Sequence, residues 1–267
     1  MPQAACRVAE RRLTVCVLAF AWRSHPRWQL VMAGNRDELH ARPAQSLARW
    51  DTPGGLLAGK DLQSGGTWLG VSERGRLGVV TNLRGFGAPL TGRPSRGLLL
   101  RDLLSGEGQY ADPAGADLTD FNPFNLIMVD GGEARFFSNR PSSMQQRLAP
   151  AVYGLSNGAL DEPWPKTVQL KNILLAWIAA DMQQPEALLD GLRDETLPQA
   201  GERSAAPSDA PQEAAVSPIF IKNPIYGTRC STVVAIDCLG HGLIVERRYT
   251  PLGDASGETT LSFSWTQ

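Results

Sequence analysis

Short runs of β-type residues, separated by turns that contain glycine, recur from one end of this 267-residue chain to the other. Leu13–Trp22 and Trp28–Ala33 are the first pair, and Arg23–Arg27 between them predicts a β-hairpin. The strongest turn signal is the Asp-Gly-Gly sequence at 130–132. Because such runs continue to Trp265, we expect a single domain of the α+β class, built mainly on antiparallel sheets and covered by helices.

The same alternation of β-type runs and turn residues predicts further strands and the segments between them. Gly34–Glu38 is polar and is expected to end the second strand, and residues 43–66 are expected to form an ordered but irregular segment because they are rich in Pro and Gly. The remaining strands are expected at Arg76–Leu83, Asn125–Val129, Ala134–Ser138, Tyr153–Asn157, Ser231–Asp237, Gly242–Tyr249 and Thr259–Trp265.

Three segments predict helices. Arg96–Leu104 is a short one, with Ser95 as its N-cap and Gly106 as its stop. Residues 164–182 carry apolar side chains with the period of a helix that is buried on one face. Pro185–Asp194 supports a second helix after it.

The composition argues against several classes of function. A formal net charge of -1 argues against a general nucleic-acid or membrane-surface binder, and no run of about 18 apolar residues is present to span a membrane. Three histidines and four cysteines lack the spacing of a metal site, and no motif demands a metal or an organic cofactor. The thiols are expected to be reduced, in a cytoplasmic protein. An export signal over Leu13–Trp22 stays an alternative, although the apolar run is short for one.

Cys16 is the first candidate for chemistry. A cysteine in a first strand is commonly a small buried hydrophobe, and this structural role carries about equal weight. The alternative is a nucleophile whose base is its own α-amino group, which has an ordinary pKa of about 8. That chemistry requires Cys16 to be the first residue of the mature protein.

Residues 1–15 are therefore expected to be an extension outside the domain, and residues 16–267 the domain itself. Self-cleavage or a misassigned start would account for the extension. Val15 favours the second, because the codon GTG encodes valine internally and methionine as an initiator. Within the domain, residues 197–217 are rich in Ala, Pro, Ser and Glu and predict a mobile loop.

Gly34–Glu38, with the sequence Gly-Asn-Arg-Asp-Glu, is the second candidate. Four polar residues at a strand end are by default a solvated turn. In a hairpin, however, this segment lies near Cys16. Asp37 could then hydrogen-bond the ammonium group of Cys16, while the charge of Arg36 could favour its thiolate.

Candidates for substrate binding surround these two segments: Asn35, Arg36, Glu38 and Trp68. For Trp68, ordinary packing in the core is the alternative. The glycine-rich sequence before Trp68 lacks the spacing of a phosphate loop, so Gly65 and Gly66 are expected to permit a close approach of the backbone beside the site.

A resemblance to a known family rests on eight segments: Cys16–Phe20, Gly34–Glu38, Ala41–Pro43, Gly59–Gly70, Thr81–Asn82, Leu155–Asn157, Pro163–Lys166 and Tyr226–Thr232. In order and spacing they resemble the NRDE family, which includes the eukaryotic transport and Golgi organisation proteins. The resemblance implies a four-layer αββα sandwich of the N-terminal nucleophile hydrolase type, in members that begin with Met-Cys. It implies no settled reaction, since haem handling, lipid or acyl-coenzyme A homeostasis and secretory-pathway organisation have all been proposed.

Penicillin V acylases and bile salt hydrolases resemble this chain more distantly, and their resemblance implies roles for five residues. Cys16 matches the nucleophile, Asp37 the aspartate after the second strand, and Asn82 the oxyanion donor. Asn157 matches the asparagine near the α-amino group, and Arg229 matches the distal arginine. Structural roles stay open for three of them: Asn82 and Asn157 as caps of strand ends, and Arg229 as a partner of Asp37.

Two functions remain after this comparison of residues. The first is Cys-dependent amide hydrolysis or acyl transfer on a small acylated compound, favoured because all five matching residues are present; Arg36 is only an approximate match to a further arginine of those hydrolases. The second is a non-catalytic carrier or chaperone for haem or for a ligand of the lipid or acyl-coenzyme A type. A bare scaffold ranks last. The sequence leaves the substrate and the oligomeric state open.

Overall fold

Two antiparallel sheets form the body of the molecule, for which a computed structural model describes residues 16–52, 54–112, 117–197 and 217–265. The six-stranded sheet A has the order β10 (Ala151–Leu155), β1 (Val17–Trp22), β2 (Trp28–Leu39), β11 (Tyr226–Asp237), β12 (His241–Tyr249) and β13 (Ala255–Ser264). The seven-stranded sheet B has the order β3 (Ala44–Arg49), β4 (Leu56–Asp61), β5 (Leu69–Ser72), β6 (Arg76–Asn82), β7 (Phe124–Asp130), β8 (Glu133–Ser138) and β9 (Met144–Arg147).

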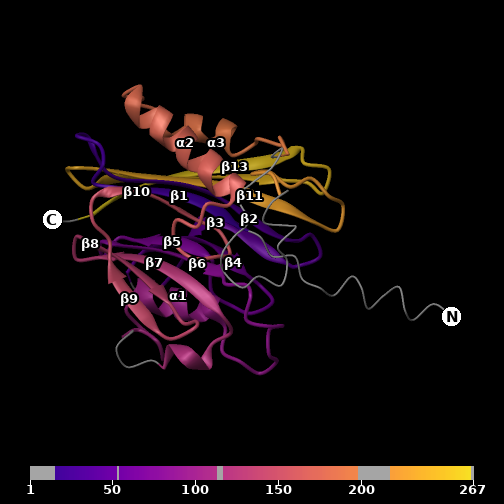
Figure 1. The fold of residues 1–267 in the computed structure, drawn as a ribbon. Helices are drawn as coiled ribbons and strands as arrows, with labels where there is room; N and C mark the ends of the chain where they lie inside the picture. The colour runs from indigo at the N-terminus through magenta and orange to yellow at the C-terminus, as the bar shows by residue number, and fades with distance from the viewer. Residues whose placement is uncertain (1–15, 53, 113–116, 198–216, 266–267) are drawn as a thin grey trace.

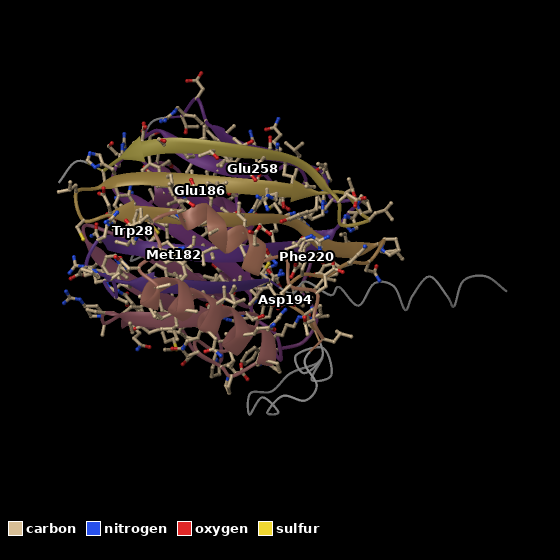
Figure 2. All side chains as sticks on the ribbon, turned by 90° about the horizontal axis from the view of Figure 1, so that it is seen from above. Trp28, Met182, Glu186, Asp194, Phe220 and Glu258 are labelled. Atoms are coloured by element: carbon tan, nitrogen blue, oxygen red, sulfur yellow. The ribbon has the colours of Figure 1, made fainter. Side chains whose placement is uncertain are left out.

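Helices cover the outer face of each sheet, which gives the molecule four layers (Figure 1). α2 (Pro165–Ala179) and α3 (Leu188–Gly191) lie on sheet A, and α1 (Arg96–Ser105) lies on sheet B. Figure 2, seen from above, shows α2 and α3 lying over the strands of sheet A. The described residues also contain two short 3-10 helices, at Leu118–Asp120 and Pro185–Ala187. The expected αββα sandwich with mainly antiparallel sheets is confirmed.

β1 shows why this sequence forms a central strand. Leu18, Phe20 and Trp22 point into the core between the two sheets, whereas Val17, Ala19 and Ala21 pack in the core beneath α2 and α3. Both faces of the strand are therefore buried, and a strand buried on both faces requires a continuous apolar run instead of an alternating one.

The helix predictions are confirmed, with one difference in length. Ser95 caps α1 by accepting a hydrogen bond from the backbone N–H of Leu98, and Gly106 ends the helix with a left-handed φ of 71°. α2 buries Leu170, Leu174 and Trp177 on one face, as their spacing predicts. The segment expected to form the next helix contains only a 3-10 turn followed by the single-turn α3.

Two strand predictions were wrong. Gly34–Glu38 does not end β2, which continues to Leu39 because β11 pairs with β2 along its whole length and removes these residues from water. Residues 43–66 are not irregular, since they contain β3 and β4, which complete one side of sheet B. Neither the continuation of β2 nor the strands β3 and β4 could be predicted, because these segments are polar or rich in Pro and Gly. β9 was not predicted at all, because its four side chains are exposed and carry no apolar pattern.

The expected extension at residues 1–15 lies outside the described residues, as does nearly all of the expected loop at 197–217. The chain on either side of the latter comes together, because the backbone N–H of Phe220 donates a hydrogen bond of 2.8 Å to the carbonyl oxygen of Asp194 (Figure 2). In the part of the chain that the structure describes, no helix has the length and apolar character needed to cross a membrane.

Candidate active site

Cys16 lies directly before β1, where its neighbours come from two adjacent strands of sheet A. Val17 pairs with Asn35 of β2, which places Cys16 beside Arg36. On the other side, the hydroxyl of Ser156 donates a hydrogen bond of 2.6 Å to the carbonyl oxygen of Cys16. The backbone of Cys16 is thus fixed at the end of the sheet where β1 begins, and its side chain is half-buried.

The electrostatic environment disfavours a thiolate at Cys16 in the chain as it stands. Burial, followed by the nearby negative charge of Asp37, raises the pKa of the thiol to about 11. A hydrogen bond from the backbone of Asp37 and the charge of Arg36 act in the opposite direction but are weaker. At neutral pH the thiol is therefore protonated and needs a base to become a nucleophile.

Asp37 is held by β11. Its side chain is only 1% exposed, and its Oδ1 accepts a hydrogen bond of 2.6 Å from the hydroxyl of Thr228, the residue opposite it in the sheet. Thr228 is itself fixed, because its hydroxyl oxygen accepts a hydrogen bond of 2.9 Å from the backbone N–H of Ile221. The prediction that Asp37 and Cys16 meet at one end of the sheet agrees with this geometry.

Arg229 lies at an irregularity in the pairing of β11 with β2, between Thr228 and Cys230. Its Nη1 donates hydrogen bonds to the carbonyl oxygens of Leu39, at 2.8 Å, and Arg42, at 3.0 Å. It therefore braces the turn between β2 and β3. Burial lowers the pKa of Arg229, and the charge of Arg36 lowers it further.

Asn157 joins the two sheets next to Cys16. The residue is fully buried; its Nδ2 donates a hydrogen bond of 2.7 Å to the carbonyl oxygen of Asn82, and its own carbonyl oxygen accepts one from the backbone N–H of Arg84. Within the described residues, Asn157 Oδ1 is buried and has no hydrogen-bond partner. Because Asn157 contacts the backbone of Asn82, the oxyanion role of the Asn82 side chain stays a prediction.

Arg36, Glu38 and Trp68 form a second part of the site, on the face of sheet A that points toward sheet B. The guanidinium of Arg36 lies 4.3 Å from the centre of the Trp68 ring. Its Nη2 is 3.9 Å from the carboxylate of Glu38 and 3.6 Å from that of Asp61. The substrate-binding role of these side chains stays a prediction, but the structure does bring them together.

Asn35 is placed differently from the other candidates for substrate binding. Its Nδ2 donates hydrogen bonds of 2.9 Å to the carbonyl oxygens of Leu192 and Ile219, and its Oδ1 accepts one of 2.7 Å from Ser231. These bonds tie β2 to the chain that covers sheet A. They satisfy the donors of the amide group, so a structural role accounts for the burial of Asn35.

Three charged residues of the site were not predicted as part of it: Arg42, Asp61 and Arg96. Arg42 and Asp61 lie in segments that resemble the NRDE family, but no role was assigned to them. Arg42 Nε donates a hydrogen bond of 2.7 Å to Asp61 Oδ2. Burial raises the pKa of Asp61, but this bond, a backbone N–H and the charges of Arg42 and Arg36 together bring it below its ordinary value. Their place in the site could not be predicted, because each comes from a different segment of the chain and only the fold brings them together.

The structure describes two other cysteines, Cys230 and Cys238. Cys230 is buried opposite Arg36 in the β2–β11 pair, and burial, followed by the charge of Glu246, raises its pKa well above the ordinary value. Cys238 is exposed in the turn between β11 and β12. Among the described residues, no group of three or more His, Cys, Asp or Glu side chains is arranged to hold a metal ion.

Comparison with known proteins assigns the chain to a family. The family model described as Transport and Golgi organisation 2 matches residues 15–251. The chain belongs to the Transport and Golgi organisation 2 family. The resemblance to the NRDE family is thereby confirmed.

Two curated relatives in this family match nearly end to end. The transport and Golgi organization protein 2 homolog of Bos taurus is 31% identical over 92% of this chain and 97% of the bovine protein. The homolog of Homo sapiens is 30% identical over 87% of this chain and 92% of the human protein. The residues that match the family model include Cys16 and every described strand except β13.

A solved structure supports the fold of this Transport and Golgi organisation 2 family member. A mutant of the conjugated bile acid hydrolase from Clostridium perfringens superposes with a TM-score of 0.52, over 93% of this chain and 92% of the hydrolase chain. Their sequences are 10% identical, so the likeness concerns the fold. It identifies the sandwich as one of the N-terminal nucleophile hydrolase type.

Proposed function

We propose that this protein is a Cys-dependent amidohydrolase or acyltransferase for a small acylated compound, with Cys16 as its nucleophile. The observation that supports this most directly is the position of Cys16. It is half-buried at the very start of β1, beside the buried Asp37 and at the point where Asn157 joins the two sheets. We also propose that the protein acts in the cytoplasm.

The raised pKa of Cys16 defines what the reaction needs. With an ordinary peptide bond before it, Cys16 has no α-amino group, and a thiol with a pKa of about 11 is almost entirely protonated at neutral pH. When Cys16 is the first residue, its α-amino group, with an ordinary pKa of about 8, supplies the missing base. The protein is therefore proposed to act in a form that begins at Cys16.

The proposed reaction proceeds in two steps, acylation of Cys16 and transfer of the acyl group from it. The α-amino group takes the thiol proton, and the sulfur attacks the acyl carbon to form a thioester while the leaving amine takes the proton. Water, or an acceptor amine, then attacks the thioester and restores the thiol. The Asn82 side chain is proposed to stabilise the oxyanion, a contribution of about 3–4 kcal/mol for a donor of this kind. Asp37 is proposed to orient the ammonium group.

The proposal is tested with two forms of the protein, the full chain and a chain that begins at Cys16. Every described strand and helix lies within residues 17–264, so the shorter form retains the complete sandwich. Each form is treated with 4-nitrophenyl octanoate and mapped by peptide mass spectrometry. We expect an octanoyl group on Cys16 of the shorter form, at a rate well above that of the exposed Cys238. Equal labelling of the two cysteines, or none at Cys16, contradicts the proposal.

The carrier function has one observation in its favour, which is the protonated state of Cys16 in the full chain. A ligand such as haem or an acyl-coenzyme A could bind beside an unreactive thiol without being transformed. Titration of both forms with hemin, followed by absorbance, and with octanoyl-coenzyme A, followed by calorimetry, tests this function. Saturable stoichiometric binding without acylation of Cys16 would favour the carrier over the enzyme.

A further inference from the structure

Arg36 is a nearly buried cation whose contacts leave it able to bind another group. It is 6% exposed, and within the described residues its side chain makes two ion pairs but no hydrogen bond. Its two carboxylate neighbours, Glu38 and Asp61, lie at 3.9 Å and 3.6 Å from Nη2, beyond normal hydrogen-bonding distance. Stacking on Trp68 fixes the plane of the guanidinium while leaving its N–H groups available.

Arg96, at the start of α1 on sheet B, brings a second guanidinium within electrostatic range of Glu38 and Cys16. Its Nη1 donates a hydrogen bond of 2.8 Å to the carbonyl oxygen of Pro123, which also accepts a bond of 3.0 Å from the backbone N–H of Leu83. Leu83 follows Asn82 in the chain. The side chain of Arg96 is thus anchored at the end of β6, next to the predicted oxyanion donor.

Charge interactions agree with this placement. Burial, followed by the charge of Arg42, lowers the pKa of Arg96 to about 10, although Glu38 and Cys16 act to raise it. Arg96 is therefore within electrostatic range of the thiol and remains a cation at neutral pH. Burial of a cation is costly unless an anion compensates for it.

The anions present do not balance the cations around the thiol. Asp61 is engaged by Arg42 at 2.7 Å, and Asp37 is hydrogen-bonded to Thr228 on the other face of sheet A. The described hydrogen bonds of Arg96 and Arg229 go to carbonyl oxygens, which carry no net charge. Arg36, Arg42, Arg96 and Arg229 thus supply four guanidiniums around this site, against the three carboxylates of Asp37, Glu38 and Asp61, which leaves one guanidinium charge uncompensated.

We propose that Arg36 and Arg96 form a binding site for a negatively charged group of the substrate, next to the acyl carbon that Cys16 attacks. This inference rests on the proposed function and specifies its substrate class: an acyl compound with a carboxylate, sulfonate or phosphate close to the bond that is broken. The three anions share the chemistry that a guanidinium recognises.

The test compares two alkylating reagents of similar size, the anionic iodoacetate and the neutral iodoacetamide, on the chain that begins at Cys16. In both reactions a thiolate carbon–sulfur bond forms and iodide leaves. Peptide mass spectrometry gives the rate at each cysteine, so the exposed Cys238 serves as an internal reference. The measured quantity is the ratio of the iodoacetate rate to the iodoacetamide rate.

We expect this ratio at Cys16 to exceed that at Cys238 by about tenfold, because positive charge concentrates the anionic reagent. Arg96→Gln should lower the ratio at Cys16 severalfold, and Arg96→Lys should largely preserve it. Arg147→Gln removes an exposed arginine of the edge strand β9 and should change nothing. Equal ratios at the two cysteines, or a ratio that Arg96→Gln leaves unchanged, overturn the proposal.

A second measurement uses no variant, so it does not depend on whether the substituted proteins fold. In the unsubstituted protein, sodium sulfate should slow iodoacetate at Cys16 more than sodium chloride of equal ionic strength does, and equal effects would contradict an anion site. If the anion site exists but the proposed function is wrong, Cys16 keeps its preference for iodoacetate but receives no octanoyl group from 4-nitrophenyl octanoate. A Cys16 that neither iodo reagent labels refutes both proposals.

Discussion

The hydroxyl of Thr228 donates a hydrogen bond of 2.6 Å to Oδ1 of Asp37 across the β2–β11 pair. The bond fixes a buried carboxylate beside Cys16, so the carboxylate does not have to be positioned by the substrate. Two strands far apart in the sequence, residues 28–39 and 226–237, are required to make it.

Replacement of Thr228 by valine should destabilise the protein by about 1–3 kcal/mol, because it leaves Asp37 Oδ1 and the backbone N–H of Ile221 buried without this partner. Valine keeps the shape of threonine, so packing changes little. Thr232→Val, on the same strand, is the matched control, since no hydrogen bond of its hydroxyl is found among the described residues. Urea unfolding of both variants measures the difference, and equal losses would contradict the assigned role.

Replacement of Asn35 by alanine should lower the free energy of unfolding by about 2–3 kcal/mol, because two carbonyl oxygens and the Ser231 hydroxyl lose their buried partner. Asn122→Ala is the control, since its two hydrogen bonds to Leu90 are exposed. A role in substrate binding would instead raise KM at unchanged stability. Thermal unfolding together with steady-state kinetics separates the two roles.

The pKa of about 11 predicts a pH profile for Cys16 in the full chain. Only the thiolate reacts, so alkylation by iodoacetamide should rise about tenfold per pH unit from neutral pH and level off near pH 11. In the chain that begins at Cys16, the α-amino group should move the inflection toward about pH 8. Mass-resolved rates across this range check both statements. A full-chain inflection below pH 9 would show that burial does not control this thiol.

Cys16→Ala should abolish acyl transfer and change stability by less than about 1 kcal/mol, because replacing a half-buried thiol by a methyl group removes little volume. Cys238→Ala, in an exposed turn, should leave both activity and stability unchanged. Release of 4-nitrophenol and thermal unfolding are the measurements. Equal turnover by Cys16→Ala and the parent protein would exclude Cys16 as the nucleophile.

Gly66→Ala should destabilise the protein more than Gly75→Ala does. Both glycines have positive φ, 97° and 82°, so each substitution carries backbone strain of about 1 kcal/mol. A Cβ at Gly66 would also collide with the carbonyl group of Gly97, in the first turn of α1, whereas one at Gly75 meets nothing. The collision should add about 1–3 kcal/mol and displace Arg96, which the ratio of iodoacetate to iodoacetamide labelling at Cys16 would also report. Equal destabilisation would show that α1 can move away.

The fold was largely predictable where apolar patterns are strong. The buried run of β1, the spacing of Leu170, Leu174 and Trp177, and the Ser95 cap each lead to the observed element. Polar strands were the failures, because the burial of Asn35 to Asp37 depends on β11, which no local pattern reveals. The expected close approach at Gly66 is confirmed by its contact with Gly97.

The site was predictable only in part, and through motifs. Cys16, Asp37 and Asn157 lie together, as their resemblance to other families implies. The hydrogen bonds of Asn35 and the arrival of Arg96 from sheet B depend on how the layers dock. Arg96 is an ordinary first residue of a helix in the sequence, and only the docked sheets bring it within electrostatic range of Glu38 and Cys16.

The strand order has a consequence for how the protein is made. Sheet B is built from one continuous stretch, residues 44–147, and can pair as it leaves the ribosome. In sheet A, by contrast, β1 cannot pair with β10, nor β2 with β11, until these later strands are synthesised more than a hundred residues further along the chain. During synthesis Cys16 therefore lacks Ser156, Asn157 and Thr228 until most of the chain has emerged. A truncated product would contain the nucleophile but not the surroundings that control it.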